Sequence, residues 1–111
     1  MVKVITLVKR KDGLTQEEFS RYWEEKHGPL IAKVFPGVRR YVQNHAARLP
    51  GGGAPQVDGV VELWFDDLEA WRAAADFYLG DEGKVIRDDE EKFLDRNKMV
   101  FFVAQEKVIV S

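Results

Sequence analysis

The apolar residues of this chain repeat with two different periods, and the order in which these periods alternate limits the folds open to it. Alternating apolar residues predict strands at residues 3–9, 38–45, 57–65 and 99–110. Apolar residues three or four apart predict helices after the first and the third of these strands. This order predicts an α+β chain of the ferredoxin-like, split βαβ type, in which a four-stranded antiparallel sheet carries helices on only one face.

The first helix has the clearest start in the sequence. Thr15, followed three residues later by Glu18, has the spacing of a capping box, in which each side chain bonds the backbone N–H of the other residue. Leu14 and Phe19 stand at the positions of a hydrophobic staple, which fixes how the chain enters the helix. We therefore expect a helix to begin directly after Thr15.

Both histidines lie where the pattern places the end or a break of an element. Pro29 disfavours a helical conformation at Gly28, so the first helix is expected to kink or pause at His27 and then resume. His45 ends the strand at 38–45, just before a loop that contains Gly51, Gly52 and Gly53. The predicted apolar stripe of the first helix, with Tyr22 and His27 on its flanks, consists of Phe19, Trp23, Leu30 and Val34.

The second half of the chain repeats the alternation of helix and strand. Asp66 and Glu69 resemble a capping box that opens a second helix, and Gly80 is expected to end it. A charged amphipathic helix is predicted at 81–96, before the last strand at 99–110. The apolar end of that strand exceeds what pairing in a small sheet needs, so we expect a partner to cover it.

Composition excludes several classes of protein. A chain of 111 residues suits a single domain, 1–111, and a domain of this size is only modestly stable, which favours a homo-oligomer. The 17 basic and 19 acidic residues form no long run of one sign, so no nucleic-acid partner is expected. The chain has no cysteine, and its N-terminus fits neither a signal peptide nor a membrane span, so a cytoplasmic protein without membrane contact is expected.

The two-residue period of a strand predicts which side chains face the helices. We assign Ile5, Leu7, Val42, Val61, Leu63 and Phe65 to the helix face. The bare face is then expected to carry Thr6, Tyr41, Gln43, His45, Glu62 and Trp64. That mixture of apolar and polar groups predicts a cavity for a small molecule, enclosed where two such sheets pack face to face.

Several motifs together resemble the EthD family over nearly the whole chain. They are Tyr22-Trp23 followed by His27-Gly28-Pro29, then the stretch from Arg40 to His45, and then Asp58-Gly59 before the stretch from Glu62 to Phe65. The resemblance implies a homodimer that forms a dimeric α+β barrel, with two ferredoxin-like subunits joined sheet to sheet. It implies the fold more firmly than the reaction.

The activity that this resemblance implies is conversion of a small organic compound. The family takes its name from a protein required beside a cytochrome P450 system for ether degradation. Relatives with the same barrel include cofactor-independent isomerases, cyclases, dehydratases and monooxygenases. We therefore expect either an enzyme without a bound cofactor or a non-catalytic binding or carrier module that serves an oxygenase system. Haem binding is a third possibility.

The candidate catalytic residues are the two histidines and two carboxylates. A histidine titrates near neutral pH, so His27 or His45 is expected to move a proton, with Glu62 or Asp58 tuning the imidazole. Backbone-bonded histidines and solvated carboxylates are the structural alternatives. The candidate substrate-binding residues are Tyr22, Tyr41, Gln43, Trp64 and Arg39.

Other sites have little support in the sequence. The two histidines with one carboxylate lack the close ligand spacing of a metal site, so no metal is expected. Ser20 and Ser111 are the only serines, and neither lies in a turn typical of a nucleophile elbow. The glycine loop lacks the lysine and the following helix of a phosphate-binding loop.

Overall fold

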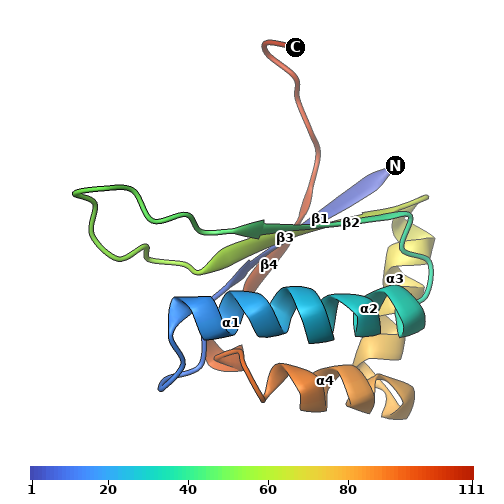
Figure 1. The fold of residues 1–111 in the computed structure, drawn as a ribbon. Coiled ribbons are helices and arrows are strands. Elements are labelled where there is room, and N and C mark those ends of the chain that lie inside the picture. The colour runs from blue at the N-terminus through green and yellow to red at the C-terminus, as the bar shows by residue number, and fades with distance from the viewer.

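The computed structural model describes residues 1–111 as a four-stranded antiparallel sheet with its helices on one face (Figure 1). In space the strands follow the order β2-β3-β1-β4, and all pairings are antiparallel, as the ferredoxin-like prediction requires. The strands are β1 (Val2–Val8), β2 (Arg40–His45), β3 (Gly59–Phe65) and β4 (Val100–Ala104). The helices are α1 (Gln16–Tyr22), α2 (Gly28–Val34), α3 (Leu68–Leu79) and α4 (Lys84–Glu90).

The predicted helix ends are confirmed with one correction. The Thr15 hydroxyl accepts a hydrogen bond from the Glu18 backbone N–H at 3.0 Å, and the Thr15 N–H donates to Glu18 at 2.9 Å. Gly80 follows the last residue of α3, as predicted. The cap of α3 is Asp67, whose carboxylate accepts from the Ala70 N–H at 2.8 Å. The prediction that Asp66 caps this helix was wrong, because the Asp66 carboxylate pairs with Arg39 instead.

A π-helical turn, Trp23–His27, joins α1 and α2 into one continuous rod (Figure 1). The Gly28 N–H donates to the Trp23 carbonyl, five residues back. Pro29 has no N–H to donate into this turn, so the regular α-helical ladder is interrupted here. The irregularity predicted before Pro29 is therefore a wide turn, after which the helix resumes at once.

The wide turn changes which residues of the rod are buried. A π-helical turn takes more residues than an α-helical one, so positions four apart stay on the same side. The apolar stripe was predicted to continue from Trp23 to Leu30 and Val34, and this was wrong because of the wide turn. His27, predicted to flank the stripe, lies within it. The buried residues of the rod are Phe19, Trp23, His27 and Ile31.

Strand register corrects the predicted faces of β1 and β2. Val4 pairs with Leu63, and Tyr41 pairs with Leu63 from the other side. Residues directly opposite in a sheet point to the same face, and Leu63 packs in the core. Val4 and Tyr41 therefore face the helices. The residues that share this face, against prediction, are Thr6, Tyr41, Gln43 and His45, and those on the bare face are Ile5, Leu7 and Val42.

The faces of β1 were predicted wrongly because this strand is apolar on both sides, so its sequence does not show which side is buried. A shift of one residue exchanges the two faces of a whole strand. On β3, where polar and apolar residues alternate more clearly, the prediction is confirmed. Phe65 is buried under α3, whereas Glu62 and Trp64 lie on the bare face.

The rod packs closely against the sheet through Trp23. Its indole lies beside Phe19 and Phe93 in the main core cluster, with Val8 beneath it from β1. At Gly59 of β3 a Cβ atom would lie only 2.4 Å from the Trp23 ring and 2.9 Å from the Asn44 carbonyl oxygen. A residue without a side chain is therefore needed at this position.

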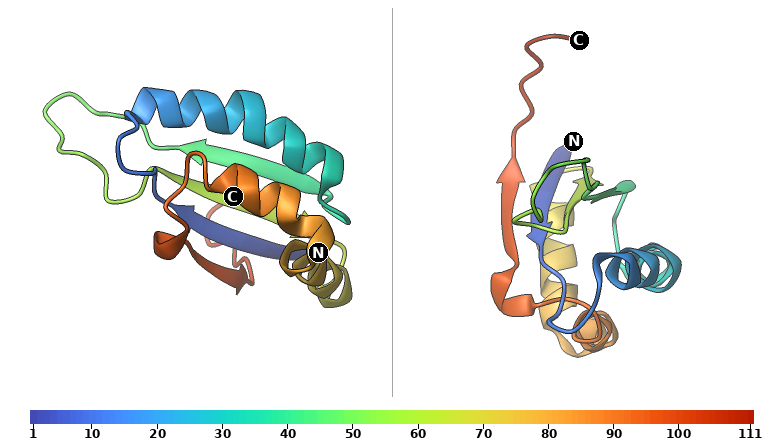
Figure 2. Two further views of the ribbon diagram at one scale, coloured as in Figure 1. Left: turned by 90° about the horizontal axis from the view of Figure 1, so that it is seen from below. Right: turned by 60° about the vertical axis from the view of Figure 1, so that its left-hand side comes forward.

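The chain after the helices differs from prediction at two places. The helix predicted at 81–96 is a short 3₁₀ turn, Asp81–Gly83, followed by α4, which ends at Glu90. The last strand ends at Ala104, and residues 105–111 extend away from the helical side (Figure 2). Val108, Ile109 and Val110 in this tail are exposed. No helix is long and apolar enough to cross a membrane.

The substitution Gly59→Ala is expected to lower the free energy of unfolding by about 1–3 kcal/mol, because the added methyl group must displace the Trp23 ring or the sheet backbone. Gly53→Ala is the matched control, since a Cβ at Gly53 meets nothing within 4 Å. Urea denaturation of both variants measures the difference. Equal stability of the two variants would show that the Trp23 contact does not restrict β3.

Candidate active site between the helices and the sheet

A cavity of about 360 Å³ lies between the helices and the sheet, inside a single chain. The sequence placed the cavity on the bare face, between two sheets, and the corrected strand faces explain why it lies on the other side. Of the 21 residues that line it, 17 are hydrophobic. The other four are Thr6, His27, Glu90 and Arg96, and two of the hydrophobic residues, Tyr41 and Tyr78, carry a hydroxyl.

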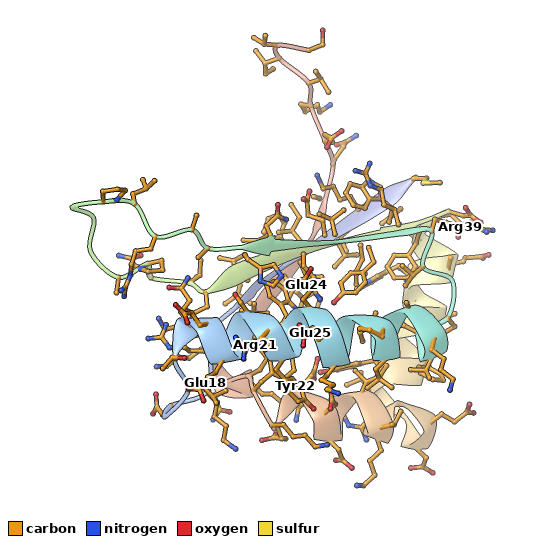
Figure 3. The ribbon with its side chains drawn as sticks, viewed as in Figure 1. Glu18, Arg21, Tyr22, Glu24, Glu25 and Arg39 are labelled. Carbon is orange, nitrogen blue, oxygen red and sulfur yellow. The ribbon has the colours of Figure 1, made fainter.

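His27 is held by a carboxylate from another helix. Its Nδ1 atom lies 2.8 Å from Oδ2 of Asp89 on α4, and Tyr22 donates its hydroxyl to Oδ1 of the same carboxylate at 2.5 Å. Figure 3 shows Tyr22 on the side of the rod that faces α4. The His27 ring also packs on Phe93, with 4.8 Å between ring centroids. The π-helical turn thus places an imidazole, and not an apolar side chain, beside α4.

The hydrogen bonds determine which nitrogen of His27 faces the cavity. A carboxylate only accepts, so Nδ1 carries the proton and Nε2 of the neutral ring has a free lone pair. Nε2 has no hydrogen-bond partner in the chain, and His27 lines the cavity. This arrangement gives a base in the lining of a mostly apolar cavity, oriented by a carboxylate.

Burial lowers the pKa of His27, although the Asp89 carboxylate opposes this shift. Burial raises the pKa of Asp89, but the hydrogen bonds from Tyr22 and His27 outweigh it, so its pKa lies below the usual value. For Tyr22, burial and the Asp89 carboxylate raise the pKa to about 12. At neutral pH the site therefore consists of a neutral imidazole, a charged carboxylate and a protonated phenol.

A second polar cluster meets the cavity from α3 and α4. Tyr78 donates its hydroxyl to the buried Glu90 carboxylate. The Arg96 Nε lies 3.4 Å from Glu90, and its Nη2 lies 3.4 Å from the Tyr78 hydroxyl. Burial raises the pKa of Glu90, and it raises the pKa of Tyr78 to about 12. This cluster contributes three of the polar side chains in a lining that is mostly apolar.

The other predicted histidine lies behind the cavity lining. His45 stacks against Trp23 with 4.4 Å between ring centroids. Its Nδ1 lies 2.9 Å from the Ser20 hydroxyl, and its Nε2 lies 2.8 Å from Oε1 of Gln43. Gln43 in turn donates to the Tyr41 hydroxyl at 2.7 Å. His45 and Gln43 therefore reach the cavity only through Tyr41.

Neither of the predicted carboxylates contacts a histidine. Glu62 pairs with Lys3 at 2.5 Å on the bare face. Asp58 is buried and accepts from the backbone N–H and the guanidinium of Arg10, at 2.8 and 2.7 Å. The carboxylate beside His27 is Asp89, which sequence reasoning missed.

Two further candidates for substrate binding also lie outside the cavity. Trp64 lies on the bare face between Lys3 and Arg40, whose charged groups are 4.9 and 4.8 Å from the ring centroid. Arg39 pairs with Asp66 in solvent, at the end of the sheet where β2 begins (Figure 3). Only Tyr41 and His27, of the predicted site residues, line the cavity.

One signal in the sequence points to the missed carboxylates. Asp89 and Glu90 follow Ile86 by three and four residues and precede Phe93 by four and three residues. Ile86 and Phe93 are buried, so the two acidic residues fall on the apolar side of α4. A carboxylate there must find a partner inside the protein, which makes it a candidate for a functional site. No group of three His, Cys, Asp or Glu side chains is placed to hold a metal ion.

Comparison with known proteins links this architecture to one family. The family model described as the EthD domain matches residues 11–97. An EthD family protein from Bacillus halodurans C-125 is 26% identical, with a TM-score of 0.71 over 96% of this chain and 99% of that chain. An EthD-like protein from Ralstonia eutropha JMP134 is 19% identical, with a TM-score of 0.64 over 98% of this chain and 92% of that chain.

A third structure has the same fold and is described as a dimer. It is a dimeric protein with a ferredoxin-like fold from Bacteroides fragilis NCTC 9343. It is 16% identical, with a TM-score of 0.63 over 95% of each chain. None of the curated proteins matches this chain.

The pKa of His27 is expected to lie below the usual histidine range, and Asp89→Asn should lower it further, because the carboxylate is what raises it. The free energy of unfolding should then fall as pH drops below the pKa of an unfolded histidine, about 6.5, until folded His27 takes up its proton. Titration of the ¹⁵N-labelled imidazole by NMR measures the pKa and shows which nitrogen carries the proton. A normal pKa with protonated Nε2 in the neutral ring would contradict the assigned geometry.

Proposed function

Because this chain belongs to the EthD domain family, which is associated with ether degradation, we propose that it assists the degradation or conversion of a small organic compound. The compound binds in the cavity between helices and sheet, and His27 moves a proton to or from it without a bound cofactor. The chamber is large enough for a small, mostly apolar molecule and presents few polar groups to it.

The observation that carries this proposal is the pairing of His27 with Asp89. The carboxylate keeps the proton on Nδ1, so Nε2 is free to accept a proton from a molecule in the cavity. When Nε2 becomes protonated, the nearby carboxylate stabilises the positive charge of the imidazolium. Tyr22 holds the other carboxylate oxygen and prevents it from rotating away.

Removal of a proton from carbon is a step that several reactions share. Isomerisation and dehydration both begin with it, and an activated carbon acid reacts with oxygen through its carbanion. The proposed role is this proton transfer, within the degradation of a compound on which an oxygenase system also acts. In the non-catalytic alternative, the same cavity would carry the compound for such a system without changing it.

We also propose that the bare face of the sheet joins a second copy of the chain, giving a dimeric α+β barrel. Ile5, Leu7 and Val42 lie on this face, where no helix of the same chain covers them. Phe102, opposite Ile5, extends the apolar surface onto β4 and is 49% exposed. An apolar sheet face of this kind is typical of a protein interface. The related structure described as dimeric supports the proposal.

The test of catalysis is exchange of hydrogen for deuterium in small carbon acids such as aryl ketones dissolved in D₂O with the protein. The wild-type chain should accelerate exchange, and His27→Asn should lower the rate by about 100-fold or more, because a positioned general base contributes at least that much. Asp89→Asn should also lower it, since the proton is no longer confined to Nδ1. NMR or mass spectrometry follows the exchange.

Lys26→Asn, a change in the same turn on an exposed residue, is the matched control and should leave exchange unaltered. Wild-type protein that binds the ketones without exchanging them would support the carrier alternative. Equal exchange by wild type and His27→Asn would contradict the role of His27.

The dimer is tested by Leu7→Lys, which places a charge on the bare face between Val60 and Val100. No carboxylate lies directly opposite this position, and burial of an unpaired ammonium group in an interface is costly, so this variant should sediment as a monomer in analytical ultracentrifugation, whereas the wild type sediments as a dimer. Leu68→Lys, at a 48% exposed apolar position on α3, is the control and should remain dimeric. A monomeric wild-type chain would refute the proposed interface.

A further inference from the structure

Behind the cavity a chain of hydrogen bonds connects Ser20, His45, Gln43 and Tyr41. The donors and acceptors of this chain can be assigned from the backbone carbonyl of Trp23, because a carbonyl oxygen can only accept hydrogen bonds. Gln43 reaches this oxygen with its side-chain amide at 2.9 Å, so the nitrogen Nε2 must be on that side. The orientation of the amide follows from this contact, and its oxygen Oε1 is turned toward His45.

The orientation of Gln43 determines the protonation of His45. Oε1 is an acceptor, so the His45 nitrogen 2.8 Å away, Nε2, must carry the proton. Burial lowers the pKa of His45, so the ring is neutral near pH 7 and Nδ1 is an acceptor. The Ser20 hydroxyl, 2.9 Å from Nδ1, is its donor. His45 therefore carries its proton on the opposite nitrogen from His27.

The same chain determines the direction of the Tyr41 hydroxyl. The second N–H of Gln43 Nε2 donates to the Tyr41 oxygen at 2.7 Å. No group of the chain accepts the hydrogen of the Tyr41 hydroxyl, although Tyr41 faces the helices and lines the cavity. The half-buried hydroxyl is therefore free to donate to a molecule in the cavity, and a ligand oxygen is the group that would accept from it.

We propose that the Tyr41 hydroxyl is the binding site for an oxygen atom of the ligand, so that the cavity takes small hydrophobic molecules with a carbonyl group. This inference rests on the proposed function, because it names the substrate class of the same cavity. Gln43 is a positioning residue, because its amide holds the Tyr41 hydroxyl. His45, itself bonded to Ser20, holds the other end of this amide. The hydrogen bond from Gln43 polarises the phenol and strengthens it as a donor.

The proposed oxygen site and the base line the same cavity. His27 Nε2 would take a proton from the carbon next to the carbonyl, breaking a C–H bond and forming an N–H bond. The electron pair of the C–H bond moves into the new C=C bond, and the carbonyl π electrons move to the oxygen. The Tyr41 hydroxyl donates to the resulting enolate oxygen and stabilises its charge. Return of a proton from Nε2 to the same carbon completes an exchange. In a ligand with a β,γ double bond the enolate is conjugated, and return of the proton to the γ carbon completes an isomerisation.

The rod is shaped to keep the Gln43 amide in place. A Cβ atom at Gly28 would lie 3.1 Å from Gln43 Nε2 and 3.3 Å from the Trp23 carbonyl oxygen. A larger residue there would press on the amide that holds Tyr41. The glycine before Pro29 therefore contributes to the ligand site without contacting the ligand.

The experiment compares two probes of the same shape, 4′-fluoroacetophenone and 4-fluoro-α-methylstyrene, in which a CH₂ group replaces the carbonyl oxygen. Dissociation constants are measured by ¹⁹F NMR for wild type and Tyr41→Phe. The variant should bind the ketone about five-fold more weakly, the effect of one neutral hydrogen bond, and should bind the alkene unchanged. The infrared C=O band of the ketone should lie at lower frequency in wild-type protein than in Tyr41→Phe.

Gln43→Leu provides a second variant that leaves the phenol intact. It should reduce the infrared shift, because Tyr41 is no longer held, and the ¹⁵N spectrum should show loss of the Nε2-protonated form of His45. The oxygen site is refuted if the ketone does not bind, if both probes weaken equally in Tyr41→Phe, or if the wild-type C=O band is unshifted. These measurements involve no turnover, so they separate failure of this site from failure of His27 as a base.

Discussion

The wide turn of the rod before Pro29 is the constraint on which the site depends. It keeps positions four residues apart on one face, so that His27 continues the buried stripe of Phe19 and Trp23. It also places the Trp23 carbonyl where the Gln43 amide can reach it. One local departure from α-helical geometry thus places the His27 imidazole in the cavity lining and, through Gln43, contributes to holding the Tyr41 phenol. π-Helical turns are frequent at functional sites for reasons of this kind.

Two carboxylates at the cavity end of α4 are stable because each accepts hydrogen bonds from other side chains of the protein. Asp89 is held by Tyr22 and His27, and Glu90 is held by Tyr78. A buried carboxylate without such donors would lose several kcal/mol on leaving water, roughly the stability of a small domain. The mostly apolar lining lowers the local polarity around these groups, which strengthens the electrostatic interactions among them.

Much of the fold was predictable because it depends on local signals. The capping box of Thr15 and Glu18, the glycine after α3 and the order of strands and helices each act within a few residues. The faces of β1 and β2 were not predictable from one sequence, because β1 is apolar on both sides and a one-residue shift moves Tyr41 to the opposite face. Asp89 was missed for a related reason. It is far from His27 in sequence, and only the packing of α4 on the rod brings them together.

The two faces of the sheet have different surroundings. The cavity belongs to its helix-covered side and is completed by residues of one chain, whereas the apolar groups free to meet a neighbour, such as Ile5 and Val42, point the opposite way. Successive residues of a strand point to opposite faces, so a substitution on the outer side of the sheet can change its surface chemistry without altering the cavity lining. A substitution in the lining likewise leaves the outer side unchanged.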